Sequence, residues 1–137
     1  MGARLGRVEQ VIVLDSHVAI WLALEPDRLS ARATTAVSEI SDQPAISAYT
    51  LFEAGWLIVR HRIRPTVPLE TFLRNMAHGF QVQPLSTEIA IAAAQLPAAF
   101  PSDPADRIIA ATALVSGAVL ITADERIRRS GAVRTIW

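Results

Sequence analysis

Five short apolar segments, separated by longer segments with helical periodicity, restrict the fold of this 137-residue sequence more than any other feature. The apolar segments are residues 11–14, 44–48, 80–85, 118–122 and 133–137. Each is short and bounded by turn residues or by the start of a helical pattern, as is typical of buried strands. Strands that alternate with helices predict an α/β fold, with a central, mostly parallel sheet of about five short strands flanked by helices.

Helices are predicted in the segments between these strands. They begin at Ser16 and after Ser30, and they cover residues 50–61, 69–77, 86–96, 105–116 and 124–129. Ser30 is a suitable N-cap, and Gly117 is expected to end the helix before it. The large aromatic residues Trp21, Phe52 and Trp56 recur at helical spacing among apolar neighbours, so we expect them to pack in the core.

One domain is predicted over residues 10–137, preceded by an N-terminal tail at residues 1–9. We find no internal repeat, linker or secretory signal in the sequence. The longest apolar run, residues 108–115, is far shorter than the roughly 18 residues that a membrane-spanning helix needs. We therefore expect no membrane partner.

The composition excludes several kinds of chemistry. The chain has no cysteine, which rules out disulfides, thiolate zinc sites and cysteine nucleophiles and is compatible with the cytoplasm. Thirteen basic residues, all arginine, balance 13 acidic residues. Net neutrality argues against nonspecific coating of nucleic acid, although arginines cluster at positions 60, 62 and 64 and again at 126, 128 and 129.

Four acidic residues lie where a predicted strand ends or a predicted helix begins. Asp15 and Asp124 each follow a strand, and Glu53 and Asp106 each lie in the first turn of a helix. In an open α/β sheet these positions share one edge, where ligands bind. Clustered carboxylates repel one another, and a divalent cation with a preference for hard oxygen ligands, Mg²⁺ or Mn²⁺, removes that penalty.

Helix capping is the alternative interpretation of the same four residues. Thr50 and Glu53 have the spacing of a capping box. Asp103, followed by Pro104, has the pattern of an N-cap before a proline at the first helical position, and Asp106 is then a favourable first-turn acid. The pattern alone leaves both the shared metal site and the capping roles open.

The segments around these acids resemble the PIN-domain ribonucleases, and specifically the VapC-type toxins of bacterial toxin–antitoxin pairs. The matching segments are VLDSHVAIWL, ISAYTLFEAGWL, DPADRIIAATAL and LITADERI, which follow one another in family order over nearly the whole chain. The resemblance implies a PIN fold, a site for one or two Mg²⁺ or Mn²⁺ ions, and cleavage of RNA. It also implies a homodimer and a cognate antitoxin that blocks the site.

Metal-assisted hydrolysis of a phosphodiester bond is the mechanism that follows from these implications. We expect Asp15 and Asp106 to be direct metal ligands. Glu53 is expected to bind metal or orient the attacking water, and Asp124 to bind a second cation or hold a water.

Two further side chains are expected to support the acids. Thr122 is placed to hydrogen-bond a ligand carboxylate or a water, and its alternative is an ordinary hydroxyl at a strand end. The same alternatives apply to Ser16 and Ser47. Arg107 is expected to pair with a carboxylate, to contact the RNA phosphate, or to form a surface ion pair.

Other functions are less consistent with the sequence. Many phosphotransferases and receiver-like modules pair an acid pocket with a functional lysine, and the absence of lysine from this chain weighs against them. No G-x-S-x-G segment suggests a serine hydrolase. Two alternatives stay open: a DNA-cleaving nuclease with the same metal site, and a non-catalytic PIN-like module that only binds a partner.

Overall fold

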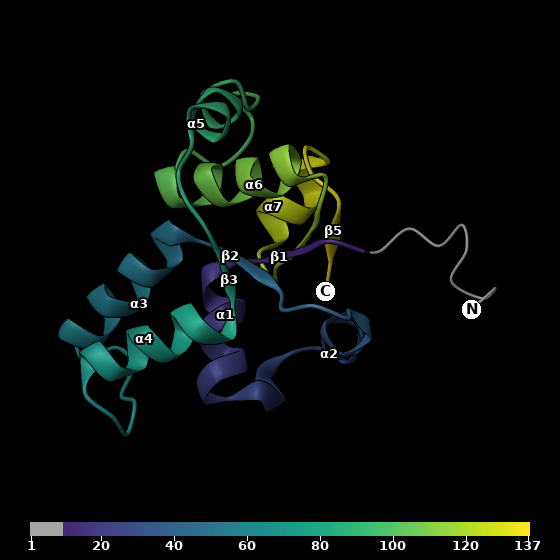
Figure 1. Ribbon diagram of the computed structural model, residues 1–137. Helices are drawn as coiled ribbons and strands as arrows, with labels where there is room; N and C mark the ends of the chain where they lie inside the picture. Colours follow the sequence, from purple (N-terminus) through teal and green to yellow (C-terminus); the bar gives the residue numbers. More distant parts are fainter. Residues whose placement is uncertain (1–9) are drawn as a thin grey trace.

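The computed structural model describes residues 10–137, and its centre is a five-stranded sheet in the order β3–β2–β1–β4–β5 (Figure 1). The strands are β1 (Ile12–Leu14), β2 (Ala45–Ser47), β3 (Gln81–Gln83), β4 (Val119–Ile121) and β5 (Thr135–Ile136). All neighbouring strands are parallel, which confirms the predicted sheet. Because β1 is central, residues that follow it lie in the middle of one sheet edge.

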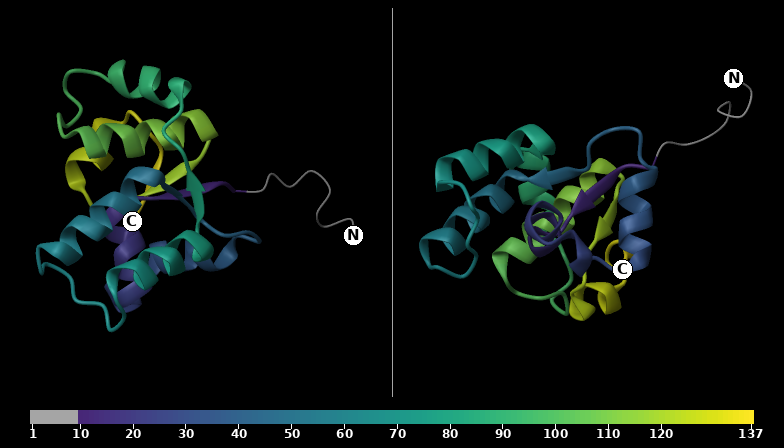
Figure 2. Two further views of the ribbon diagram at one scale, coloured as in Figure 1. Left: turned by 60° about the vertical axis from the view of Figure 1, so that its left-hand side comes forward. Right: turned by 90° about the horizontal axis from the view of Figure 1, so that it is seen from below.

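Helices cover both faces of this sheet (Figures 1 and 2). They are α1 (Ser16–Leu24), the 3₁₀ helix η2 (Pro26–Arg28), α2 (Ala31–Glu39), α3 (Ala48–Val59), α4 (Leu69–Gly79), α5 (Thr87–Ala94), α6 (Pro104–Ser116) and α7 (Glu125–Ser130). In Figure 1, α1 to α4 lie below the sheet and α5 to α7 above it. The short helix η2 was not predicted from the sequence.

Side chains alternate between the two faces along each inner strand. In β1, Ile12 and Leu14 pack against α1 to α4, whereas Val13 packs against α6 and α7. In β4, Ile121 lies on the face covered by α1 to α4, and Leu120 lies on the face covered by α6 and α7. Since both faces are buried, β1 and β4 are apolar at every position, which explains why they are recognisable in the sequence as short apolar runs.

Some of the helix ends predicted from the sequence agree with the structure, and one does not. Ser30 accepts a hydrogen bond from the Ala33 amide at 3.1 Å, and Gly117 ends α6 with a φ of 64°, so both predictions are confirmed. The capping box at Thr50 and Glu53 is wrong, because α3 begins two residues earlier with Ser47 as its N-cap. Glu53 is therefore free of a local capping role.

The packing expected for the aromatic residues is correct for Trp21 and wrong for Phe52 and Trp56. Trp21 packs against the core between the sheet and helices α1 to α4, and its ring centroid lies 5.9 Å from that of Trp137. Phe52 and Trp56 are 61% and 51% exposed on α3. This helix is apolar around most of its surface, and only one of its faces meets the core.

Residues 1–9, expected as a tail, lie outside the described residues. In the part of the chain that the structure describes, no helix is both long and apolar enough to cross a membrane. The longest described helix, α6, has 13 residues.

Candidate active site

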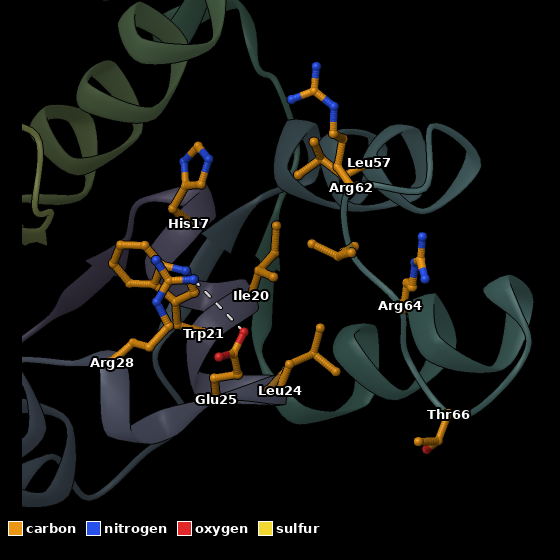
Figure 3. Close-up of a pocket in the computed structure, with 12 residues that line it drawn as sticks. His17, Ile20, Trp21, Leu24, Glu25, Arg28, Leu57, Arg62, Arg64 and Thr66 are labelled. Carbon is orange, nitrogen blue, oxygen red and sulfur yellow. Dashed lines mark ion pairs between the residues drawn. The ribbon is translucent and has the colours of Figure 1, made fainter.

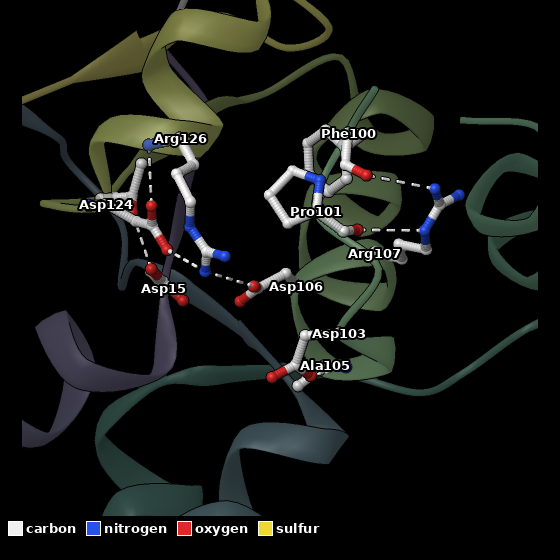
Figure 4. Close-up of polar contacts among 10 residues, drawn as sticks. Asp15, Phe100, Pro101, Asp103, Ala105, Asp106, Arg107, Asp124 and Arg126 are labelled. Carbon is white, nitrogen blue, oxygen red and sulfur yellow. Dashed lines mark hydrogen bonds and ion pairs between the residues drawn. The ribbon is translucent and has the colours of Figure 1, made fainter. Parts of the chain in front are cut away.

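The four acids singled out in the sequence lie at the carboxyl edge of the sheet. Asp15 is the N-cap of α1 after β1, and Asp124 is the N-cap of α7 after β4. Asp106 lies in the first turn of α6, and Glu53 lies in α3, which follows β2. Figure 4 shows Asp15, Asp106 and Asp124 around one space. We refer to these four residues as the acid cluster.

Asp15 is held from both of its carboxylate oxygens. The hydroxyl of Thr122 donates to Oδ2 at 2.6 Å, and the amide of Ser16 donates to Oδ1 at 2.8 Å. Thr122 in turn accepts a hydrogen bond from the Asp124 amide at 3.1 Å. The hydrogen bond expected between Thr122 and a carboxylate of the site is therefore present, and this residue links the ends of β1 and β4.

Glu53 is joined to the start of α1 by two hydroxyl groups. The hydroxyl of Ser16 donates a short hydrogen bond to Glu53 Oε1. Ser16 Oγ also lies 2.9 Å from the hydroxyl oxygen of Thr50. A serine hydroxyl has one hydrogen, so Thr50 must be the donor of the second bond. Thr50 was predicted only as a helix cap. Its position three residues before Glu53 on the same helix is the sequence feature that indicates it lies beside this carboxylate.

The guanidinium of Arg126 lies between two members of the acid cluster (Figure 4). Its Nη2 atom is 3.5 Å from Asp124 Oδ2 and 3.9 Å from Asp106 Oδ2. Among residues 10–137, no three His, Cys, Asp or Glu side chains are close enough as they lie to hold a metal ion. The arginine side chain is 71% exposed, so it is free to move away from the carboxylates. This contact was not predicted from the sequence.

Burial and mutual repulsion raise the pKa of three acids in the cluster. Burial is the main cause for Asp15 and Glu53, and the hydrogen bonds from Thr122 and Ser16 oppose it. For Asp106, burial and the charges of Asp103, Asp15 and Asp124 raise the pKa from 3.8 to about 6. Carboxylates that favour protonation in this way form a site where a cation is stabilising.

We expect the free energy of unfolding, measured by urea titration in a chelator, to fall as the pH rises from about 4 to about 7. The folded protein binds protons at Asp106 more tightly than the unfolded chain does, since the folded pKa is about 6 and the ordinary value 3.8. The destabilisation is absent below the ordinary pKa and complete above the folded one. Mg²⁺ added at neutral pH should restore stability. Equal stability at both ends of this range would contradict the raised pKa of Asp106.

Among the described residues, Arg107 forms no ion pair with a carboxylate, which was one of the roles expected for it. Its side chain points away from Asp106 and donates to the backbone carbonyl oxygens of five residues (Figure 4). These carbonyls belong to Ala93, Leu96, Pro97, Phe100 and Pro101, at 3.1–3.3 Å. The predicted ion pair with a carboxylate is wrong, because the loop between α5 and α6 turns its carbonyl groups toward the guanidinium.

Asp103 and Ser47 are both helix N-caps. Asp103 accepts the Ala105 amide at 2.9 Å as the N-cap of α6, and its charge also raises the pKa of Asp106 and Glu53. It therefore belongs to the electrostatic surroundings of the acid cluster. Ser47 accepts the Tyr49 amide at 3.1 Å, which makes it a helix cap.

A parallel sheet with acidic residues gathered at its carboxyl edge is the arrangement of the PIN domain, and the model of that family matches residues 12–132. The chain belongs to this family. It is 40% identical over 128 residues to Ribonuclease VapC22 of Mycobacterium tuberculosis, and the match covers 92% of this chain and 98% of that protein. The resemblance to VapC-type PIN proteins drawn from the sequence is confirmed.

Solved structures show the same fold at lower identity. The chain superimposes on VapBC2 from Rickettsia felis, bound to a promoter DNA fragment, with a TM-score of 0.71 at 14% identity, covering 93% of this chain and 98% of that one. DNA-bound VapBC from Salmonella typhimurium gives a TM-score of 0.71 at 19% identity, with 93% and 97% coverage.

Proposed function

We propose that this chain is a metal-dependent endoribonuclease and the toxin of a toxin–antitoxin pair. The observation that carries the proposal is the acid cluster, in which four carboxylates from separate elements lie at the edge of the sheet where ligands bind, near enough for their charges to interact. The match to a protein named as a VapC ribonuclease supports RNA as the substrate. We place the activity in the cytoplasm.

The donor set of the acid cluster fits Mg²⁺ or Mn²⁺. All of its candidate ligands are carboxylate oxygens, and hard divalent cations prefer oxygen ligands. Burial, together with the charges of neighbouring carboxylates, raises the pKa of three of these groups, and a bound cation would favour their ionised forms. We propose Asp15 and Asp106 as direct ligands of one or two cations, with Asp124 as a further ligand or a holder of water.

When bound, such a cation would neutralise charge on the phosphate and lower the pKa of the attacking water. The protein's own groups hold the carboxylates of the acid cluster in position. Thr122 and the Ser16 amide fix both oxygens of Asp15, so this carboxylate keeps one orientation. Ser16 fixes one oxygen of Glu53. The other oxygen remains available to orient the water, and burial raises the pKa of Glu53 toward the range useful in proton transfer.

Thr122→Val should weaken Mn²⁺ binding about 10-fold, because loss of a hydrogen bond that orients a metal ligand typically has this effect. The hydroxyl of Thr122 is the group that holds Asp15 Oδ2. Isothermal titration calorimetry measures the change. Thr112→Val is the matched control, since Thr112 is equally buried but donates to the backbone of its own helix at Ile108. Equal affinities in the two variants would contradict the positioning role.

Cleavage assays separate the proposal from its alternatives. Labelled RNA and the matched deoxy strand are incubated with Mg²⁺ or Mn²⁺, with and without excess chelator. We expect metal-dependent cleavage of RNA within the strand. Preferential cleavage of the deoxy strand would favour a DNA nuclease, and no cleavage of either strand would favour a non-catalytic binding module.

The partner that we propose is a cognate antitoxin. The structural neighbours include VapBC from Salmonella typhimurium and a structure described as a toxin–antitoxin complex from Klebsiella pneumoniae. An antitoxin that covers the acid cluster would prevent access of RNA. Co-expression with the protein encoded beside this chain tests the proposal: a stable complex that no longer cleaves RNA is the expected result.

A homodimer is proposed from the exposed aromatic face of α3. Phe52, Trp56 and Val59 are 61%, 51% and 59% exposed, and they follow one another at helical spacing. The rings of Phe52 and Trp56 stack at 6.2 Å between centroids. Exposed apolar stripes of this kind mark association surfaces, and aromatic residues contribute most to them.

Trp56→Glu should raise the dissociation constant of the dimer about 100-fold or more, the effect of losing an aromatic anchor. Sedimentation velocity over a range of concentrations measures it. Leu114→Glu is the control, since Leu114 is 42% exposed on a different helix, α6. Dimers of equal strength in both variants would place the interface elsewhere.

A further inference from the structure

A hollow of about 800 Å³ lies beside α1, outside the acid cluster (Figure 3). On one side it is lined by His17, Trp21 and Arg28, from α1 and η2. On the other side it is lined by Arg62 and Arg64, from the connection between α3 and α4. Apolar side chains of α1 and α3 lie between these two walls (Figure 3).

Positive charge dominates the lining of this hollow. Three arginines line it, and Glu25 is its single acidic residue. Glu25 lies 3.8 Å from Arg28, whereas Arg62 and Arg64 form no ion pair with any described residue. In a chain of zero net charge, this makes the hollow a local site of uncompensated positive charge.

An aromatic and guanidinium stack lies in the same wall. The guanidinium carbon of Arg28 is 4.4 Å from the centre of a Trp21 ring, and His17 lies 6.1 Å from that tryptophan between centroids. Planar cations and aromatic rings of this kind are the surfaces on which unpaired nucleobases stack. Arg28 is exposed, so one face of its guanidinium is open to a ligand.

Two helices run from the acid cluster to the hollow. Helix α1 begins at its cap, Asp15, and continues along the hollow to its last residue, Leu24. On α3, Leu57 lines the hollow one turn after Glu53. His17 lines the hollow and lies two residues after Asp15, and a positive charge on its ring would lower the pKa of both Asp15 and Glu53. The hollow is therefore adjacent to the acid cluster along both helices.

We propose that the hollow binds the single-stranded part of the substrate RNA adjacent to the cut bond, an inference that rests on the proposed ribonuclease function. Arg62 and Arg64 contact phosphates, and an unpaired base stacks against Arg28 and Trp21. The excess of guanidinium groups over carboxylates favours a polyanion over a protein segment as the occupant.

The test is RNA binding by the double variant Arg62→Gln, Arg64→Gln. Both side chains are exposed, so the fold should be retained. Fluorescence anisotropy follows an unstructured, labelled RNA of about 12 nucleotides. An Asp106→Asn background with Mg²⁺ prevents cleavage. We expect a Kd about 10-fold higher and a salt dependence weaker by about 1.4 in slope, since each phosphate contact to single strands contributes about 0.7.

Arg32→Gln combined with Arg74→Gln is the matched control, because both arginines are exposed and neither lines the hollow. A Kd and salt slope equal to those of the parent in both double variants would overturn the proposal. So would unchanged RNA binding together with lost binding of a co-expressed antitoxin, which would make the hollow a protein-docking site. If RNA binds through Arg62 and Arg64 but the parent protein never cleaves it, the result would support RNA binding in the hollow and refute the ribonuclease function.

Discussion

Asp106→Asn lowers the rate of RNA cleavage about 10³-fold or more, equivalent to about 4 kcal/mol of lost transition-state stabilisation. Asp106 is the member of the acid cluster whose carboxylate accepts no hydrogen bond among the described contacts, so its charge is its main contribution. The substitution removes a charge and preserves the shape of the side chain. Single-turnover cleavage of labelled RNA measures the loss.

The same variant should be more stable than the parent protein in the absence of divalent cations at neutral pH. The carboxylate of Asp106 is disfavoured by burial and by the charges of Asp103, Asp15 and Asp124, and the amide avoids that repulsion. A functional loss with a gain in stability distinguishes a charged site from a structural residue.

Asp42→Asn is the control for both measurements. Asp42 precedes β2 at the opposite edge of the sheet, and its Oδ1 accepts the Gln43 amide at 2.8 Å, a bond that asparagine can keep. Cleavage and stability should match those of the parent. If Asp106→Asn also cleaved RNA at the parental rate, the assignment of the acid cluster as the active site would be wrong.

Arg107→Met destabilises the folded protein by about 2–4 kcal/mol, because hydrogen bonds from a charged group are lost and partly buried carbonyls remain unpaired. The guanidinium joins carbonyl groups of α5, such as Ala93, to carbonyls of the following loop, such as Pro101. Its charge also lies near the C-terminal end of α5, where a cation is favourable. Urea unfolding followed by circular dichroism measures the change.

Arg107→Lys should recover only part of this stability, since an ammonium group cannot reach carbonyls on both sides as the planar guanidinium does. Arg74→Met, at an exposed position on α4, should change stability by less than about 0.5 kcal/mol. A small effect at Arg107 would show that the loop is held by other contacts. A large effect would identify Arg107 as the residue that places the start of α6, and with it Asp106.

The positions of the strands and of the acid cluster could be predicted because both depend on local sequence. A strand buried on both faces must be apolar at every position, as in Ile12, Val13 and Leu14. An acid within a few residues of the end of such a strand must lie near the carboxyl edge, as Asp15 and Asp124 do. These relations hold whatever the rest of the chain does.

Contacts between distant segments could not be predicted in the same way. Arg107 follows Asp106 in the sequence, yet the helix directs the two side chains to different surroundings, one to the loop carbonyls and one to the acid cluster. Arg126 was not expected to reach Asp106, because that contact joins α7 to α6. Side-chain direction in a helix depends on the packing of its neighbours, which a single sequence does not specify.

The apolar pattern of the chain determined the order of strands and helices, the parallel sheet, and the edge at which the acids lie, since hydrophobic periodicity and strand direction are local properties. Tertiary packing alone decided which apolar face of α3 is buried, leaving Phe52 and Trp56 exposed. It also joined Ser16 to Glu53 and placed Arg62 and Arg64 opposite Trp21 around one hollow. Those arrangements depend on how separate elements meet in space, and the free energy that selects them comes from contacts between residues far apart in the chain.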